Sequence, residues 1–275
     1  MDVLRESAHT LMGFNATSDS NGRLTRYPGK KEIPCPTAND RTAVLLVVGQ
    51  SNAANYANHM STTAFADRVI NYHDGRCYEA ASPLLGAMGL QGEGWTPLGN
   101  MLVASGLYDR VVLIPVAVGA TALRRWTKGS DLNRVLIQEI KRSQTLYHIT
   151  HVLWHQGEAD LIEMTSSPAY RKMFLDMTHS LREAGLTAPI YVAVTTQCEP
   201  NKSASSDNPV AAAQMSLPDV DQNILAGPNT DGAILESDRY DGCHFRKSGT
   251  MKFAAAWFEA IRPSRGGTAM LTQGE

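Results

Sequence analysis

The chain has 275 residues, of which 43% are hydrophobic and 19% are charged, and this fits one large globular domain better than two small ones. Its 25 basic and 27 acidic side chains give a formal net charge of -2. Because these charges are spread along the sequence, neither nucleic acid nor an anionic membrane surface is an expected partner.

The N-terminal sequence gives no sign of membrane insertion or of export. Met1 to Ser7 carries charges of both signs and lacks the apolar segment of a secretion signal. Apolar runs such as 43–48 and 111–118 are far shorter than the roughly 18 residues that span a bilayer. We therefore expect a soluble protein, in the cytoplasm or, if a signal has been removed, in the periplasm or outside the cell. The oligomeric state stays open.

Residues 1–40 are polar and rich in Asn, Ser, Gly, Lys and Pro, which predicts an irregular N-terminal arm. The next segment, residues 41–263, reads as one domain in which short apolar runs form buried parallel strands. Residues 264–275 are predicted to be a tail. The strands are expected at 43–48, 68–72, 111–118, 151–154, 190–195 and 224–226.

Stretches with helical spacing of apolar residues lie between these runs, at 132–140, 170–181 and 251–261. Alternating strands and helices predict a three-layer α/β/α sandwich, flavodoxin-like, with a central parallel sheet of about five strands. Residues 52–67 and 74–106 look like loop-rich insertions. Ligands of such sheets bind at the carboxyl ends of the strands.

The first strand ends in Gly49-Gln50-Ser51-Asn52, which places Ser51 at the carboxyl edge of the sheet. N–H groups of the following helical turn would favour the negative charge that develops during acyl transfer. A serine hydroxyl also needs a base. The sequence Asp241-Gly242-Cys243-His244 supplies an imidazole and a carboxylate to orient it, so we expect Ser51, Asp241 and His244 to form a catalytic triad.

A third polar segment, Trp154-His155-Gln156-Gly157-Glu158, also follows a strand directly. Gln156 can donate from its side-chain amide. With the backbone N–H of Ser51 and that of Gly94 or Gly92, it would form an oxyanion hole of three donors. Glu158 is interpreted as a buried brace for the first loop.

These segments, in this order, resemble the SGNH hydrolase superfamily and within it the branch of carbohydrate acetylesterases that includes sialate O-acetylesterases and acetylxylan esterases. The resemblance covers about residues 43–262. Within this range, Ala81-Ser82-Pro83-Leu84 and residues 116–121 also support it. It implies that Ser51 is the nucleophile and that Asp241 and His244 complete the triad.

This chain departs from the family pattern at two places. Relatives usually carry Gly-x-Gly-Pro-Gly where it reads Gly92-Glu93-Gly94-Trp95-Thr96-Pro97, which leaves the choice between Gly92 and Gly94 open. They also tend to have a second glycine after Gly119, where this chain has Ala120.

Each of these residues also has a plainer interpretation. A serine after a strand is often only a helix cap, and Gln156 could simply tie loops together. Gln50, Trp126 and Arg124 are candidates for substrate binding, although residues 124–126 could equally be a solvated turn with one packed Trp. Cysteines at 35, 77, 198 and 243 form no Cys-x-x-Cys pair, so no metal is expected, while their even number leaves disulfides open.

The sequence therefore predicts a serine esterase that removes O-acetyl groups from a carbohydrate through an acetyl-serine intermediate, without a cofactor. An O-acetyltransferase with the same triad is the alternative. A carbohydrate-binding protein without catalysis would be expected to lack a member of the triad. Which acetylated sugar is the substrate stays open.

Overall fold

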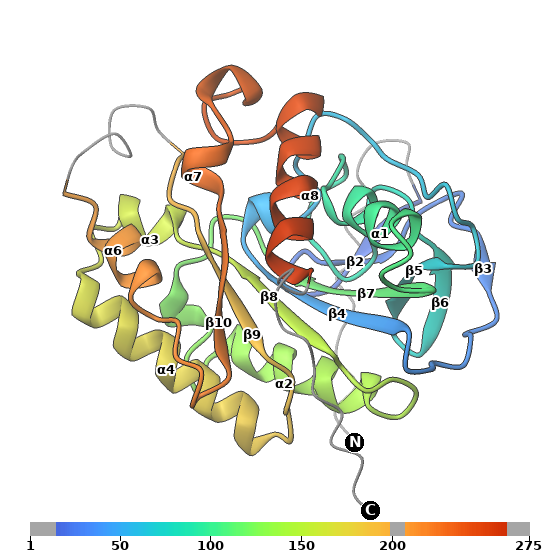
Figure 1. The fold of residues 1–275 in the computed structure, drawn as a ribbon, viewed down its shortest axis with the longest axis horizontal. Helices are drawn as coiled ribbons and strands as arrows, with labels where there is room; N and C mark the ends of the chain where they lie inside the picture. Colours follow the sequence, from blue (N-terminus) through green and yellow to red (C-terminus); the bar gives the residue numbers. More distant parts are fainter. Residues whose placement is uncertain (1–14, 199–206, 263–275) are drawn as a thin grey trace, which may run out of the picture.

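The computed structural model describes residues 15–198 and 207–262. Its centre is an eight-stranded sheet (Figure 1). From one edge to the other the strands are β10 (Ile224–Asn229), β9 (Ile190–Val194), β8 (His151–His155), β4 (Thr42–Gly49), β7 (Arg110–Ala117), β5 (Val69–His73), β6 (Arg76–Glu79) and β3 (Glu32–Ile33). The six strands from β10 to β5 are parallel, β6 pairs antiparallel with β5, and β3 pairs antiparallel with β6.

The α/β class and the parallel centre of the sheet confirm the prediction, but the sheet is wider than the expected five or so strands. All six predicted strands are present. The strand β6 was not predicted because only Cys77 of its four residues is buried, so it shows no continuous apolar run.

Helices cover both faces of the sheet (Figure 1). The helices α1 (Trp95–Ala104) and α8 (Lys247–Ile261) pack on one face, where Leu45 and Val47 of β4 point. On the other face lie α2 (Asp131–Ser143), α4 (Ser167–Glu183) and α6 (Pro209–Met215), against Val44, Leu46 and Val48. Since successive side chains of a strand point to opposite faces, the continuous apolar run of β4 fills both cores. No helix in the described ranges is long and apolar enough to cross a membrane.

Residues 15–40 are more ordered than their composition predicts. A small hairpin forms from β1 (Thr17–Ser18) and β2 (Leu24–Arg26), and β3 joins the main sheet. A disulfide between Cys35 and Cys77 ties this segment to β6. The sequence did not predict these strands because each has only two or three residues, too few to show a periodic pattern. Residues 1–14 of the predicted arm and the predicted tail at 264–275 lie outside the described residues.

The carboxyl ends of β4 and β8 meet at Gly49. Its backbone φ is +152°, and a Cβ at this position would lie 1.9 Å from the carbonyl oxygen of His155. The N–H of Gln50 donates to the same carbonyl over 3.2 Å. Only glycine allows this approach, which brings the end of β4 beside the end of β8.

We expect Gly49→Ala to remove at least about 4 kcal/mol of unfolding free energy or to prevent folding, because the clash is with backbone that cannot move aside. The matched control is Gly29→Ala, which also has positive φ (+76°) but meets nothing within 4 Å. That variant should lose only about 1–2 kcal/mol. Urea unfolding of both proteins measures the difference, and equal losses would contradict the close approach.

Candidate active site

A cavity of about 360 Å³ opens at the carboxyl ends of the parallel strands. Its walls come from the loops after β4, β7, β8 and β9 and from the loop before α8. The lining residues are Gln50, Ser51, Tyr56, Met88, Gly119, Ala120, Ala159, Ile162, Glu163, Cys198 and His244. Sites in open parallel sheets form at this edge, so the cavity is the candidate active site.

Ser51 begins a short 3₁₀ turn, η1 (Ser51–Ala53), directly after β4. Among the described hydrogen bonds its backbone N–H donates to no protein group. The next residue, Asn52, donates its Nδ2 to Glu158 Oε1 over 2.8 Å and to the carbonyl of Cys243 over 3.3 Å. Asn52 therefore links the serine turn to the segment after β8 and to the loop that carries His244.

Asp241 and His244 form a compact pair. His244 Nδ1 lies 2.6 Å from Asp241 Oδ2, while Asp241 Oδ1 accepts the backbone N–H groups of Cys243 (3.0 Å) and His244 (2.7 Å). Burial opposes ionisation of Asp241, but the hydrogen bonds from His244 and from these backbone groups outweigh it and lower its pKa below the usual 3.8. Asp241 is thus held as a carboxylate that fixes the ring of His244.

Two tyrosine rings enclose the imidazole of His244. The Tyr56 ring stacks on it with centroids 5.2 Å apart and planes inclined by 21°, and Tyr240 does so at 5.9 Å and 29°. The described hydrogen bonds include none between Ser51 Oγ and His244, although both residues line the cavity. Serine and base often come within hydrogen-bond distance only when substrate is bound.

The residues that line the cavity do not include Gly92, Gly94 or Gln156, which the sequence predicted as oxyanion donors. The N–H of Gly92 is used by the carbonyl of Ala57 at 2.7 Å, and Gly94 precedes α1, packed against Phe253. Gln156 is fully buried. Its Nε2 lies 2.6 Å from Asp160 Oδ2 and 3.1 Å from the carbonyl of Thr121, which act as its acceptors behind the cavity wall.

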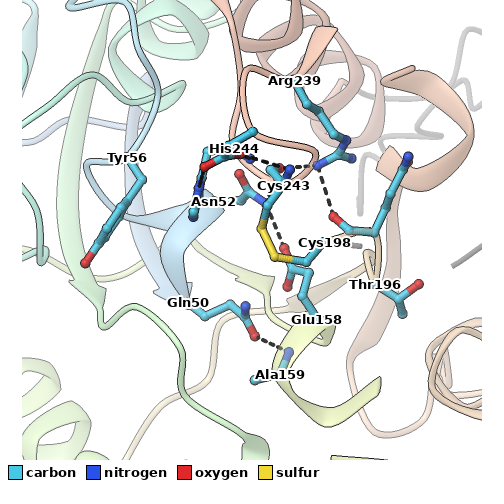
Figure 2. Close-up of a disulfide and its surroundings, with 12 residues drawn as sticks. Gln50, Asn52, Tyr56, Glu158, Ala159, Thr196, Cys198, Arg239, Cys243 and His244 are labelled. Atoms are coloured by element: carbon cyan, nitrogen blue, oxygen red, sulfur yellow. Dashed lines mark hydrogen bonds and ion pairs between the residues drawn. A yellow bond between two sulfur atoms is a disulfide. The ribbon is translucent and has the colours of Figure 1, made fainter. Parts of the chain in front are cut away.

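Gly119 and Gln50 do line the cavity beside Ser51. Gly119 follows β7, the direct neighbour of β4, and its N–H has no partner among the described residues. Gln50 Oε1 accepts the N–H of Ala159 at 3.1 Å and Gln156 Nε2 at 3.2 Å. These bonds fix the amide so that Nε2 points away from Ala159 (Figure 2).

Of the predicted substrate-binding residues, only Gln50 lines the cavity. Trp126 is completely buried against Trp154, and its Nε1 donates to Thr121 Oγ1 at 3.3 Å, so it cannot offer a face to a sugar. Arg124 is exposed and pairs with Glu163, which does line the cavity. Arg124 therefore belongs to the outer rim.

Glu158 braces the site from behind. Besides Asn52, its carboxylate accepts the N–H of Gly157 at 3.1 Å and the hydroxyl of Thr195 at 3.3 Å. Burial raises the pKa of Glu158 to about 7, although the hydrogen bond from Asn52 favours the ionised form. This matches the brace expected from the sequence.

Of the eleven lining residues, only Gln50, Ser51 and His244 were predicted as site residues from the sequence; the other eight include Tyr56, Met88, Ile162 and Glu163. They come from loops and from α3 (Glu158–Ile162), where no periodic pattern indicates which side chain faces the cavity. The sequence does hint that Gly119 lies at the carboxyl edge of the sheet, because it follows a long apolar run just as Ser51 does. Only the order of strands shows that this run lies beside β4.

A sequence model of the family described as "carbohydrate esterase, sialic acid-specific acetylesterase" matches residues 41–262. Among curated proteins, the chain is 34% identical over 59 residues to a probable carbohydrate esterase from Arabidopsis thaliana. That match spans 21% of this chain and 23% of the plant protein, about a quarter of the relative's length.

Solved structures share the fold. A protein from Arabidopsis thaliana superposes with a TM-score of 0.64 at 18% identity, over 80% of this chain and 97% of that one. The protein NanS gives 0.56 at 15% identity, over 81% and 97%. A carbohydrate acetylesterase from Xanthomonas citri gives 0.51 at 17% identity, over 80% of this chain and 56% of that one.

The raised pKa of Glu158 predicts a pH dependence of stability. Between about pH 4.5 and 7 the unfolded chain has lost this proton while the folded chain keeps it, so unfolding free energy falls as pH rises through this window. One pKa unit corresponds to about 1.4 kcal/mol, which makes the total fall about 3 kcal/mol. The variant Glu158→Gln has no such proton and should gain stability relative to wild type across the window.

Urea unfolding at a series of pH values measures this difference. Thr195→Val is the matched control, because it removes one partner of Glu158 at 3.3 Å but leaves the carboxyl group. It should keep the wild-type slope. Parallel pH profiles for Glu158→Gln and wild type would contradict the raised pKa.

Proposed function

Because this chain belongs to the carbohydrate esterase family of sialic acid-specific acetylesterases, we propose that it removes O-acetyl groups from a carbohydrate through an acetyl-serine intermediate on Ser51. The family and the shared SGNH-type fold make it a carboxylic ester hydrolase. The observation that carries the proposal is that Ser51 and the Asp241-paired His244 line one cavity.

In this mechanism Ser51 Oγ attacks the carbonyl carbon of the acetyl ester while His244 Nε2 takes the hydroxyl proton. The bond from the carbonyl carbon to the sugar oxygen then breaks, and His244 returns the proton to that oxygen. Water next attacks the acetyl-serine by the same route and releases acetate. Asp241, bound to Nδ1, keeps the imidazole in the tautomer whose Nε2 can accept a proton.

Three donors support an oxyanion hole in the proposal: the backbone N–H groups of Ser51 and Gly119, and Gln50 Nε2. Neither N–H has another partner among the described residues, and all three residues line the cavity. The hydrogen bond from Ala159 to Gln50 Oε1 holds the side chain in place before the reaction. Donors fixed in advance need no reorganisation when the negative charge forms.

The remaining wall is suited to a small acyl group. Met88, Ala120, Ala159 and Ile162 give it an apolar surface next to Ser51. Ala120 has φ of +54°, a left-handed conformation that an alanine adopts at a cost of about 1 kcal/mol. Its position after Gly119 keeps a methyl group in the wall where relatives tend to have glycine.

Ser51→Ala tests the nucleophile. Release of acetate from p-nitrophenyl acetate and from a panel of acetylated glycans should become undetectable, because no other group is placed to form the acetyl intermediate, while unfolding free energy changes by less than about 1 kcal/mol. Ser105→Ala, at the end of α1, is the control and should keep full activity. Retained turnover in Ser51→Ala would reject the mechanism. Wild-type transfer of acetyl to an added glycan without hydrolysis would indicate the O-acetyltransferase instead.

Gln50→Glu tests the third donor of the oxyanion hole. The carboxylate keeps the acceptor for Ala159 but replaces the donating Nε2 by an oxygen, so kcat should fall at least about 10²-fold with little change in KM. Steady-state kinetics on p-nitrophenyl acetate measures this. An unchanged kcat would show that Gln50 does not contact the transition state.

A further inference from the structure

All four cysteines are paired, and one of the two disulfides joins the loop that carries the acid and base to the segment after β9. Cys243 stands between Asp241 and His244 in sequence and is bonded to Cys198 (Figure 2). Cys198 itself lines the cavity. This disulfide has no part in the mechanism above, which leaves its role open.

Cys243 is a junction of three segments. Its sulfur is bonded to Cys198, after β9. Its carbonyl accepts Nδ2 of Asn52, the neighbour of Ser51, at 3.3 Å, and Nη1 of the buried Arg239 (Figure 2). The backbone that leads into His244 is therefore tied to the serine turn and to the end of β9 at a single residue.

The other end of the disulfide is anchored as well. Thr196 donates its N–H (2.9 Å) and hydroxyl (2.6 Å) to the carboxylate of Asp231, and the N–H of Gln197 donates to it at 3.0 Å. Arg239 Nη1 also reaches the carbonyl of Gln197 at 3.2 Å. The two residues before Cys198 are therefore anchored to the body of the domain.

On its C-terminal side His244 is followed by Phe245, which is buried against Phe253 and accepts the N–H of Asn58 at 2.9 Å. On its N-terminal side the disulfide is the one covalent cross-link of this loop to the body of the domain. The bonds from Asp241 are local, and its side chain is 39% exposed, against 19% for His244. The stacked Tyr240 lies on the same loop. Without the disulfide, the backbone before His244 would be held by non-covalent contacts alone: the Asn52 and Arg239 bonds to Cys243, and the hydroxyl of Tyr240, which donates to the carbonyl of Tyr56 at 3.1 Å.

We propose that the Cys198–Cys243 disulfide is a positioning element that holds His244 in reach of Ser51, so that a dithiol which reduces it lowers turnover without unfolding the protein. In that reaction the disulfide takes two electrons and two protons and becomes two thiols, while the dithiol closes to a cyclic disulfide. The proposal rests on the proposed function of Ser51 and His244.

The second disulfide is a matched control. Cys35 and Cys77 are 42 residues apart in sequence, and Cys198 and Cys243 are 45 apart, so the two cross-links restrict the unfolded chain to a similar degree. Cys35–Cys77 joins the N-terminal segment to β6, and neither residue lines the cavity. Loss of either disulfide should therefore lower the unfolding free energy by a similar amount, but only loss of Cys198–Cys243 should lower the rate of catalysis.

The first experiment compares Cys198→Ala/Cys243→Ala with Cys35→Ala/Cys77→Ala. Both pairs should lower the denaturant midpoint by similar amounts. Only the first should lower kcat for acetate release, at least tenfold, with KM within about twofold of wild type. If kcat of the two variants agrees within twofold, the proposal is wrong.

The second experiment uses the Cys35→Ala/Cys77→Ala protein, in which Cys198–Cys243 is the one remaining disulfide, and so does not depend on the first variant folding. Reduction with dithiothreitol should lower kcat and the rate at which a fluorophosphonate labels Ser51 by at least tenfold. Reoxidation with oxidised glutathione should restore both. Unchanged rates after reduction, with the thiols confirmed by mass spectrometry, would overturn the positioning role. A protein that is inactive in the oxidised state as well would instead refute the proposed function.

Discussion

The site depends on one close contact between backbones, the approach of β4 to β8 at Gly49. With no side chain at that position, the N–H of Gln50 can donate to the carbonyl of His155, and the chain turns at once into η1. Ser51 and Gln50 then face the cavity, while the residues after His155 support them from behind. A parallel sheet brings strand ends together, but the missing Cβ sets the distance between these two.

Hydrogen bonds between buried polar groups connect the serine turn to the loop that carries His244. Asn52 donates to Glu158 and to the carbonyl of Cys243. Arg239 donates to the same carbonyl. Few buried groups in this chain of contacts are left without a partner, although Arg239 Nε and Nη2 are. Because an unpaired buried polar group is costly, these bonds favour one relative placement of the serine turn and the histidine loop, to which the disulfide adds a covalent link.

Much of this could be predicted from the sequence, and the part that could not has a physical reason. Long apolar runs mark buried strands, so the fold class and the strand-end position of Ser51 were readable. Asp241 and His244 are only three residues apart, and so the sequence predicted them as a pair. Gly119 and Gln50, the oxyanion donors proposed above, were not predicted from the sequence, because that choice depends on which strand lies beside β4 and on Asp160 and Thr121 accepting hydrogen bonds from Gln156. Trp126 was ambiguous for the same reason: only packing decides whether an aromatic ring meets a sugar or a core.

The two tyrosines that enclose His244 also bear on the electrical charge of the ring. In the proposed mechanism the imidazole becomes a cation when it takes the serine proton, and the faces of aromatic rings attract cations within about 6 Å of their centroids. Tyr56 and Tyr240 lie within that range, at 5.2 and 5.9 Å, and their planes are close to parallel with the imidazole. Asp241 is therefore not alone in stabilising the imidazolium. The aromatic pair does so without adding a second negative charge to a loop that faces the developing oxyanion.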